Sequence, residues 1–197
     1  MVRVGISVEG LTEERFVERS LQPHLAQKNI FVTPISLAGN VSIDRIGHEL
    51  TKLMYSFDFV TTFYDFYGFK KKQEGETKFS LESRILESIA APLQNRCIPY
   101  IQMYEFEGLL FSSPAVIASV LEDEDLAVWA EGVLRQFGGN PELINDSPET
   151  APSKRLESTP YRKTTHGPNI AKEIGLHVLR QKCVGFGQWL ETLEALQ

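Results

Sequence analysis

The sequence predicts an α/β fold with a mostly parallel, four-stranded sheet, helices on both of its faces and further helices towards the C-terminus. Apolar runs rich in β-branched and aromatic residues alternate with helical patterns over the first 115 residues, which is typical of parallel sheets. Hydrophobic residues make up 42% of the 197 positions and charged residues 23%, as in ordinary globular proteins. Acidic residues directly follow three of the four predicted strands.

The predicted elements of the first part follow one another in strand–helix order. Strands are predicted at residues 2–8, 30–37, 59–64 and 98–104. Between them, apolar residues recur at helical spacing around residues 12–25, 43–57 and 81–93. Thr12 is a candidate N-cap for the first of these helices.

After Ser113-Pro114, a cap followed by a proline that suits the first turn of a helix, the pattern becomes helical throughout. Helices are predicted at residues 116–121, 126–137, 168–174 and 186–193, and residues 140–167 are expected to be loop-like. The helix at 168–174 is expected to open at Gly167-Pro168. We therefore expect a core of residues 1–115 and a helical part, residues 116–197, packed on it in one compact domain.

Composition excludes several classes of protein. No apolar run approaches the ~20 residues of a membrane helix, and the N-terminus lacks the features of a signal peptide. Cys97 and Cys183 have no neighbouring ligand-type residues, so we expect free thiols and a cytoplasmic protein. The net charge of −6 argues against a protein that coats nucleic acid by bulk electrostatics. No phosphate-binding loop, dinucleotide fingerprint or Ser/His/Asp order is present.

The acidic residues at the strand ends are the candidate site. Glu9 follows the first strand, Asp65 ends the third, and Glu105 and Glu107 follow the fourth. The carboxyl ends of parallel strands lie along one edge, where ligands bind, and carboxylates gathered there suit Mg²⁺. If the fourth strand continues, Glu105 and Glu107 share one face. If a helix begins at Phe106, only one of them points into the site.

Basic residues gather in one later segment. Residues 150–182 carry seven Lys or Arg side chains against two Glu. This segment is either a solvated surface or a face that binds phosphates. The candidate phosphate-binding residues are Lys154, Arg155, Arg162, Lys163 and His166. The lysine run at residues 70–72 is a second candidate, against the simpler interpretation of a solvated loop.

Three strings, VEGLTEERF, TTFYDFYGF and EFEGLLF, resemble the Toprim fold of topoisomerases, primases and overcoming-lysogenisation-defect nucleases. In that fold a glutamate follows the first strand, an Asp-x-Asp follows a later one, and a metal joins them. With PSKRLES, YRKTTHGPNIAKEIGL and CVGFGQWLETLEAL, the pattern is similar to the domain-of-unknown-function 4276 family, a Toprim-like group, over nearly the whole chain. Some of its relatives are nuclease components of anti-phage defence in bacteria or archaea.

The resemblance implies that Glu9 is the Toprim glutamate and Asp65 the first aspartate of Asp-x-Asp. Tyr67 stands where the second aspartate belongs. Either Glu105 or Glu107 replaces that ligand, or the metal is held weakly, or the site is inactive. We expect Glu107 rather than Glu105 as the third ligand, with Glu9 alternatively a general acid or base.

Two functions of different classes follow. The first is Mg²⁺-dependent (or Mn²⁺-dependent) hydrolysis of phosphodiester bonds in nucleic acid, with a metal at Glu9, Asp65 and Glu107. The alternative is a catalytically silent Toprim-like module that binds a partner ATPase or senses a nucleotide. The sequence leaves open the choice of DNA or RNA, the trigger and the oligomeric state.

Overall fold

A parallel sheet forms the centre of the N-terminal half. In the computed structural model, which describes residues 1–39, 41–145 and 148–197, the strands are β1 (Val2–Val8), β2 (Ile30–Ser36), β3 (Phe59–Asp65), β4 (Cys97–Ile98) and β5 (Ile101–Gln102). Their order is β2-β1-β3-β4, with β5 also beside β3, and every pair is parallel. The predicted α/β class and four-position sheet are therefore confirmed.

The fourth position of the sheet is interrupted, whereas the sequence predicted one strand over residues 98–104. Pro99 follows β4 and has no N–H to donate to a ladder. Thr62 replaces the missing contacts with its hydroxyl, which donates to the carbonyl of Tyr100 (2.7 Å) and accepts from the N–H of Tyr100 (2.8 Å). The interruption therefore costs no buried hydrogen bond at Tyr100.

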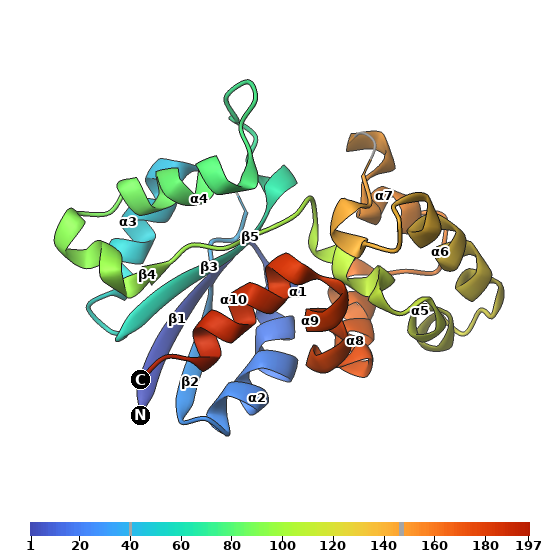
Figure 1. Cartoon of the computed structure of the whole chain (residues 1–197), viewed down its shortest axis with the longest axis horizontal. Helices are drawn as coiled ribbons and strands as arrows, with labels where there is room; N and C mark the ends of the chain where they lie inside the picture. The colour runs from blue at the N-terminus through green and yellow to red at the C-terminus, as the bar shows by residue number, and fades with distance from the viewer. Residues whose placement is uncertain (40, 146–147) are drawn as a thin grey trace.

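Helices cover both faces of the sheet (Figure 1). One face carries α1 (Leu11–Phe16), a π-helical turn η1 (Val17–Leu21), α2 (Gln22–Ala26) and the last helix, α10 (Val184–Glu194). The other face carries α3 (Ile43–Leu53) and α4 (Lys78–Glu87). Two separate apolar clusters lie against these two faces, as expected of a sheet buried on both sides.

The later helices form a lobe beside the sheet (Figure 1). They are α5 (Pro114–Leu121), α6 (Asp125–Gln136), α7 (Pro152–Leu156), α8 (Lys163–Ile174) and α9 (Leu176–Lys182). Short 3₁₀ turns connect elements in both halves: η2 (Phe66–Gly68), η3 (Ala91–Arg96), η4 (Phe106–Ser112), η5 (Pro141–Leu143) and η6 (Pro148–Thr150). After α9 the chain returns to the sheet, and the two termini lie close together (Figure 1).

The larger apolar cluster joins the two parts of the chain. It extends from residues of β1 through η4, α5 and α8 to α10. Trp189 of α10 stacks on Phe63 (centroids 5.3 Å apart) and on Tyr100 (4.6 Å). Its indole N–H donates to the hydroxyl of Thr61 (2.8 Å). The C-terminal helices therefore share a core with the sheet.

Two predicted helix starts were wrong. Gly10, not Thr12, is the N-cap of α1, because the Glu13 carboxylate accepts the N–H of Gly10 (3.0 Å). Helix α8 begins at Lys163 and not at Pro168, which lies inside it. Proline cannot donate to the carbonyl four residues earlier, and Arg15 of α1 donates to that carbonyl, Thr164 O, instead (2.5 Å).

The expected loop over residues 140–167 was also wrong in part. It contains α7 and the start of α8, while residues 146–147 lie outside the described residues. The expectation for the cysteines is confirmed, since Cys97 and Cys183 are both buried and free. Within the described ranges, no helix is long and apolar enough to cross a membrane.

Candidate metal site at the strand ends

Glu9 and Asp65 lie side by side at the carboxyl edge of the sheet. Val8, the last residue of β1, is level with Phe63 of β3, and Asp65 is two residues further along β3. Adjacent strands are about 4.8 Å apart, so Glu9 follows directly beside the end of β3. This is the place where the strand order reverses between β1 and β3, the usual position of a ligand site in such sheets.

Asp65 is fixed by a contact with the chain that follows the interrupted strand. Its Oδ1 accepts the N–H of Phe106 (2.7 Å), and its Oδ2 lies 3.8 Å from the ammonium of Lys163. The residue is 6% exposed. A carboxylate buried to this extent needs hydrogen bonds or a cation to remain charged.

The structure decides between the two glutamates after the fourth strand. The strand ends at Gln102, and the 3₁₀ turn η4 begins at Phe106, so Glu105 and Glu107 do not share a strand face. Glu107 is fully buried and accepts the Tyr161 hydroxyl (3.1 Å). Glu105 instead accepts the N–H of Ser153 at the start of α7 (2.8 Å). Glu107 is therefore the one that lies with Asp65 around Lys163, and its role as a metal ligand remains a prediction.

Lys163, the first residue of α8, connects these carboxylates. Its ammonium lies 3.4 Å from both oxygens of Glu107 in addition to its contact with Asp65. The side chain is still 46% exposed. His166 stabilises the start of α8, because its Nδ1 accepts the N–H of Arg162, the N-cap residue (3.1 Å).

A fourth carboxylate, Glu13, belongs to the same site. It is 3% exposed and lies one helical turn after Glu9. It was not among the site residues predicted from the sequence. The sequence signal for Glu13 is its position three residues after Gly10, which directly follows Glu9. With Gly10 as the N-cap, the Glu13 carboxylate turns back towards the end of β1.

Burial raises the pKa of all four carboxyl groups. The pKa of Glu13 rises to about 7, and those of Glu9, Asp65 and Glu107 also lie above their ordinary values. The ammonium of Lys163 opposes this effect at each of them. Burial disfavours the charge on Lys163 itself, but the carboxylates outweigh it and raise its pKa. Four carboxyl groups and one ammonium leave the site short of positive charge.

Glu9 provides the clearest sign of a missing partner. Its Oε2 is buried and has no hydrogen-bond partner in the part of the chain that the structure describes. Gly68 of η2 leaves space for this oxygen, because a Cβ at that position would lie 2.4 Å from it. A buried carboxylate oxygen without a partner is expensive, and a cation would remove the cost.

The donor set fits a hard divalent cation such as Mg²⁺, since all of its members are carboxylates. Among residues 1–39, 41–145 and 148–197, no group of three or more His, Cys, Asp or Glu side chains is arranged so that it could hold a metal ion. Mg²⁺ does not require such a group, because it usually binds one or two carboxylates and completes its shell with waters and phosphate. Glu9, Asp65 and Glu107 are the residues that would hold it.

The other predicted basic residues lie in or directly before α7 and α8. Lys154 and Arg155 are in α7, not in a loop. Lys154 pairs with Glu157 (2.5 Å), while Arg155 donates to the carbonyl of Thr150 (2.7 Å) and lies over the ring of Phe137. The phosphate-binding roles of these residues, and of Arg162 and His166 at the start of α8, remain predictions.

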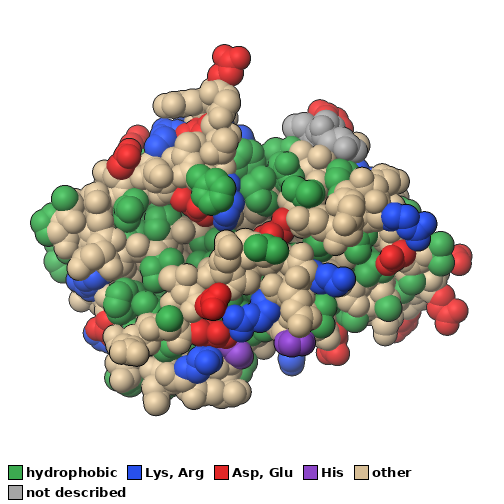
Figure 2. All heavy atoms as spheres, in the orientation of Figure 1, with side chains coloured by type: hydrophobic (Ala, Val, Ile, Leu, Met, Phe, Trp, Pro, Cys, Tyr) green, Lys and Arg blue, Asp and Glu red, His purple; other side chains and the backbone are tan. Residues whose placement is uncertain are grey.

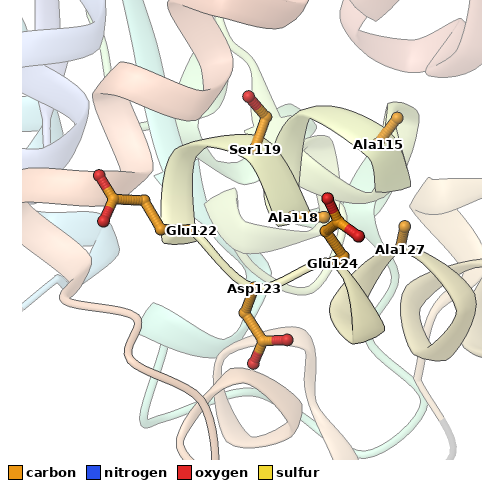
Figure 3. Close-up of a pocket in the computed structure, with 7 residues that line it drawn as sticks. All are labelled: Ala115, Ala118, Ser119, Glu122, Asp123, Glu124 and Ala127. Carbon is orange, nitrogen blue, oxygen red and sulfur yellow. The ribbon is translucent and has the colours of Figure 1, made fainter.

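The hollow drawn in Figure 3 is a separate feature. It measures about 490 Å³ and is lined by α5, α6 and their connection. Three acidic residues, Glu122, Asp123 and Glu124, border it, but their carboxylates point in different directions (Figure 3). They make no counterpart to the carboxylates that converge at the strand ends.

The sheet order, the reversal between β1 and β3 and the acidic strand ends define a Toprim-like α/β protein. The structure resembles the C-terminal region of the Burkholderia pseudomallei OLD protein with a TM-score of 0.51 and 17% identity, covering 98% of this chain and 97% of that one. The chain belongs to the family described as "Domain of unknown function (DUF4276)", whose model matches residues 8–194. Among curated proteins, none matches the sequence.

Proposed function

We propose that this protein hydrolyses phosphodiester bonds in nucleic acid with Mg²⁺ or Mn²⁺ held by Glu9, Asp65 and Glu107. The observation that carries the proposal is the meeting of carboxylates that follow three strands: Asp65 and Glu107 are buried, and Glu9 has a buried oxygen without a hydrogen-bond partner among the described residues. The likeness to the OLD C-terminal region concerns the fold alone, so the proposal depends on the residues of this chain.

Each residue has a defined part in this proposal. A metal bound here would polarise the phosphate and acidify an attacking water. The Phe106 N–H and the Tyr161 hydroxyl hold the carboxylates of Asp65 and Glu107 in position. The Lys163 ammonium lies beside the carboxylates of Asp65 and Glu107, and the side chain is half-exposed. It could therefore reach a bound phosphoryl group and offset its negative charge.

Glu13 is a candidate proton donor or acceptor at neutral pH. Its pKa of about 7 is close to the working pH of most proteins, where an acid or base exchanges protons most effectively. Glu9, which the sequence also suggested for this role, has the orphaned oxygen and is better used as a metal ligand.

The test compares the wild type with Glu9→Gln, Asp65→Asn and Glu107→Gln on single-stranded and double-stranded DNA and RNA, with Mg²⁺ or Mn²⁺. Each substitution removes one charged ligand, and we expect a loss of about a hundredfold or more in hydrolysis. Glu105→Gln is the matched control, since Glu105 accepts the Ser153 N–H and acts on Glu9, Glu107 and Lys163 through its charge alone. A second readout is the rise in melting temperature on adding Mg²⁺, which the same three substitutions should abolish.

The silent binding module is the competing proposal. Two observations favour it: Tyr67 stands where a second aspartate is expected, and Lys163 already lies between Asp65 and Glu107. No hydrolysis and no metal-dependent rise in melting temperature would support a module that binds a partner ATPase or a nucleotide. A metal-dependent rise without hydrolysis would indicate a nuclease that its partner must activate.

A further inference from the structure

Two tyrosines, Tyr67 and Tyr104, stand beside the carboxylate site. Tyr67 follows Asp65 by two residues, and Tyr104 directly precedes Glu105. Their rings are 5.5 Å apart between centroids and tilted by 45°, and both residues are partly exposed. The N–H of Tyr67 donates to the carbonyl of Tyr104 (3.0 Å). The two strand-end segments therefore present one aromatic surface next to the site.

The backbone at Tyr104 is strained. Its φ is +57°, and the N–H of Glu105 donates to the carbonyl of Met103 (2.9 Å), which closes a three-residue turn around it. A turn of this hand is rare and strained for an aromatic residue, whereas glycine adopts it freely. The backbone at this position therefore favours glycine, although the chain has an aromatic residue there.

Lysines lie along the same aromatic surface. The Lys72 ammonium lies 4.8 Å from the centroid of Phe66 and 5.4 Å from that of Tyr67, and it donates to the carbonyls of Phe66 and Phe69. Lys70 and Lys71, just before it, are exposed. Lys70 also lowers the pKa of Glu9, so its charge acts on the carboxylate site.

We propose that Tyr67 and Tyr104 form a platform on which an unpaired base of a single-stranded nucleic acid stacks, while Lys70 and Lys71 contact its phosphates. Stacking of bases on aromatic side chains beside a basic track is how sequence-tolerant single-strand binders work. A base in a duplex is already stacked between its neighbours and does not offer its face. The inference deepens the proposed function and rests on it, because the strand held here would be the substrate.

The charge distribution favours a single strand over a duplex. On the face seen in Figure 2, Lys and Arg side chains are interspersed with Asp and Glu and form no continuous basic surface. The chain also carries a net charge of −6. Duplex binding depends mainly on many phosphate contacts, whereas stacking requires only one or two rings and a few nearby lysines.

The experiment measures binding by fluorescence anisotropy with EDTA present, so that hydrolysis cannot interfere. The probes are oligo-dA, oligo-rA, an abasic oligodeoxynucleotide with the same number of phosphates, and a duplex. The variants are Tyr67→Leu, which removes one ring, and Tyr104→Gly, which removes the other and also relieves the strained turn. Tyr55→Ser is the matched control, because Tyr55 is 88% exposed and follows α3 at the opposite edge of the sheet.

We expect each of the two variants to lose about tenfold in affinity for oligo-dA and oligo-rA, with no change for the abasic strand. Tyr67→Phe and Tyr104→Phe keep the ring and should bind as the wild type does. Lys70→Gln should weaken binding of base-bearing and abasic strands alike. Whichever of the two homopolymers binds more tightly identifies the preferred sugar.

Three outcomes would overturn the platform: no binding of either homopolymer by the wild type, equal wild-type affinity for the abasic strand, or unchanged affinity in Tyr67→Leu and Tyr104→Gly. Circular dichroism and melting temperature establish that Tyr104→Gly is folded, as expected from its relaxed backbone. Stacking without hydrolysis and without a metal-dependent rise in melting temperature would retain the platform and reject the nuclease. If both tyrosine variants hydrolyse the substrate and bind it with unchanged affinity, the nuclease would be retained and the platform rejected.

Discussion

Two regions of this molecule bury carboxylates in opposite ways. Glu142 of η5 is 8% exposed, and its two oxygens accept the N–H groups of Gly185 (2.8 Å) and Phe186 (3.1 Å) at the start of α10. At the strand ends, by contrast, Glu9 has an oxygen without a partner among the described atoms, and burial raises the pKa of each carboxyl group. Burial alone therefore does not mark a functional carboxylate. What distinguishes the strand-end carboxylates is burial with too few hydrogen-bond donors, as at Glu9 Oε2 among the described residues.

The largest effect should come from pH, through Glu13. Its pKa is raised from 4.5 to about 7 by burial, so between these values the folded state binds more protons than the unfolded state. Stability therefore falls as pH rises through this window, by about 3 kcal/mol. Glu13→Gln should remove this contribution, while the raised pKa values of Glu9, Asp65 and Glu107 continue to lower stability as pH rises. Denaturant unfolding of the wild type and the variant with EDTA at pH 5 and pH 8 would measure the difference.

The control for this prediction is Glu131→Gln, a change on the exposed side of α6. It should leave the pH dependence of the wild type intact. A Glu13→Gln protein whose stability still falls by the same amount between pH 5 and pH 8 would assign the pH dependence to other groups.

The capping carboxylate should behave differently. Glu142→Gln places an amide donor against the N–H groups of α10, and we expect a loss of about 2 kcal/mol in unfolding free energy. For a chain of this size that is a fall of about 4–8 °C in melting temperature. The response to Mg²⁺ should be unchanged. If Glu142→Gln instead abolished that response, the contrast between the two regions would be wrong.

Gly68→Ala tests the space reserved for Glu9. A Cβ there would lie 2.4 Å from Glu9 Oε2, and the side chain of Glu9 can move away at little cost in stability. We expect the Mg²⁺ concentration at half effect on melting temperature to rise about tenfold, equivalent to ~1.4 kcal/mol. Gly132→Ala is the matched control, since no atom lies within 4 Å of its Cβ position.

The smallest effect is expected at Glu105. Glu105→Gln keeps an oxygen that can accept the Ser153 N–H, so its stability should change by less than about 0.5 kcal/mol. Its Mg²⁺ response should remain that of the wild type, whereas Glu107→Gln should lose it. If Glu105→Gln and Glu107→Gln lost the Mg²⁺ response equally, Glu105 and Glu107 would have the same role in metal binding, contrary to the prediction.

Much of the candidate site was predictable because strand ends are easy to recognise. Hydrophobic runs ending in Glu9 and Asp65 predict two parallel strands, and parallel strands place their carboxyl ends together. Glu13 was missed because its role depends on Gly10 serving as the N-cap, two residues earlier than a local N-cap preference for Thr12 suggested. The contacts of Lys163 with Asp65 and Glu107 were not predicted, and its phosphate-binding role remains a prediction.

The sequence by itself determined the order of strands and helices, the buried cysteines and the acidic strand ends, because these follow from local periodicity and composition. Only the tertiary structure decided that Glu107 enters the site while Glu105 turns to α7, and that Lys163 lies between the carboxylates. Those outcomes depend on contacts between segments 40 to 150 residues apart, such as Phe106 with Asp65 and Arg15 with Thr164. Local pattern carries no information about such contacts, because they are set by how α8 packs against α1 and η4.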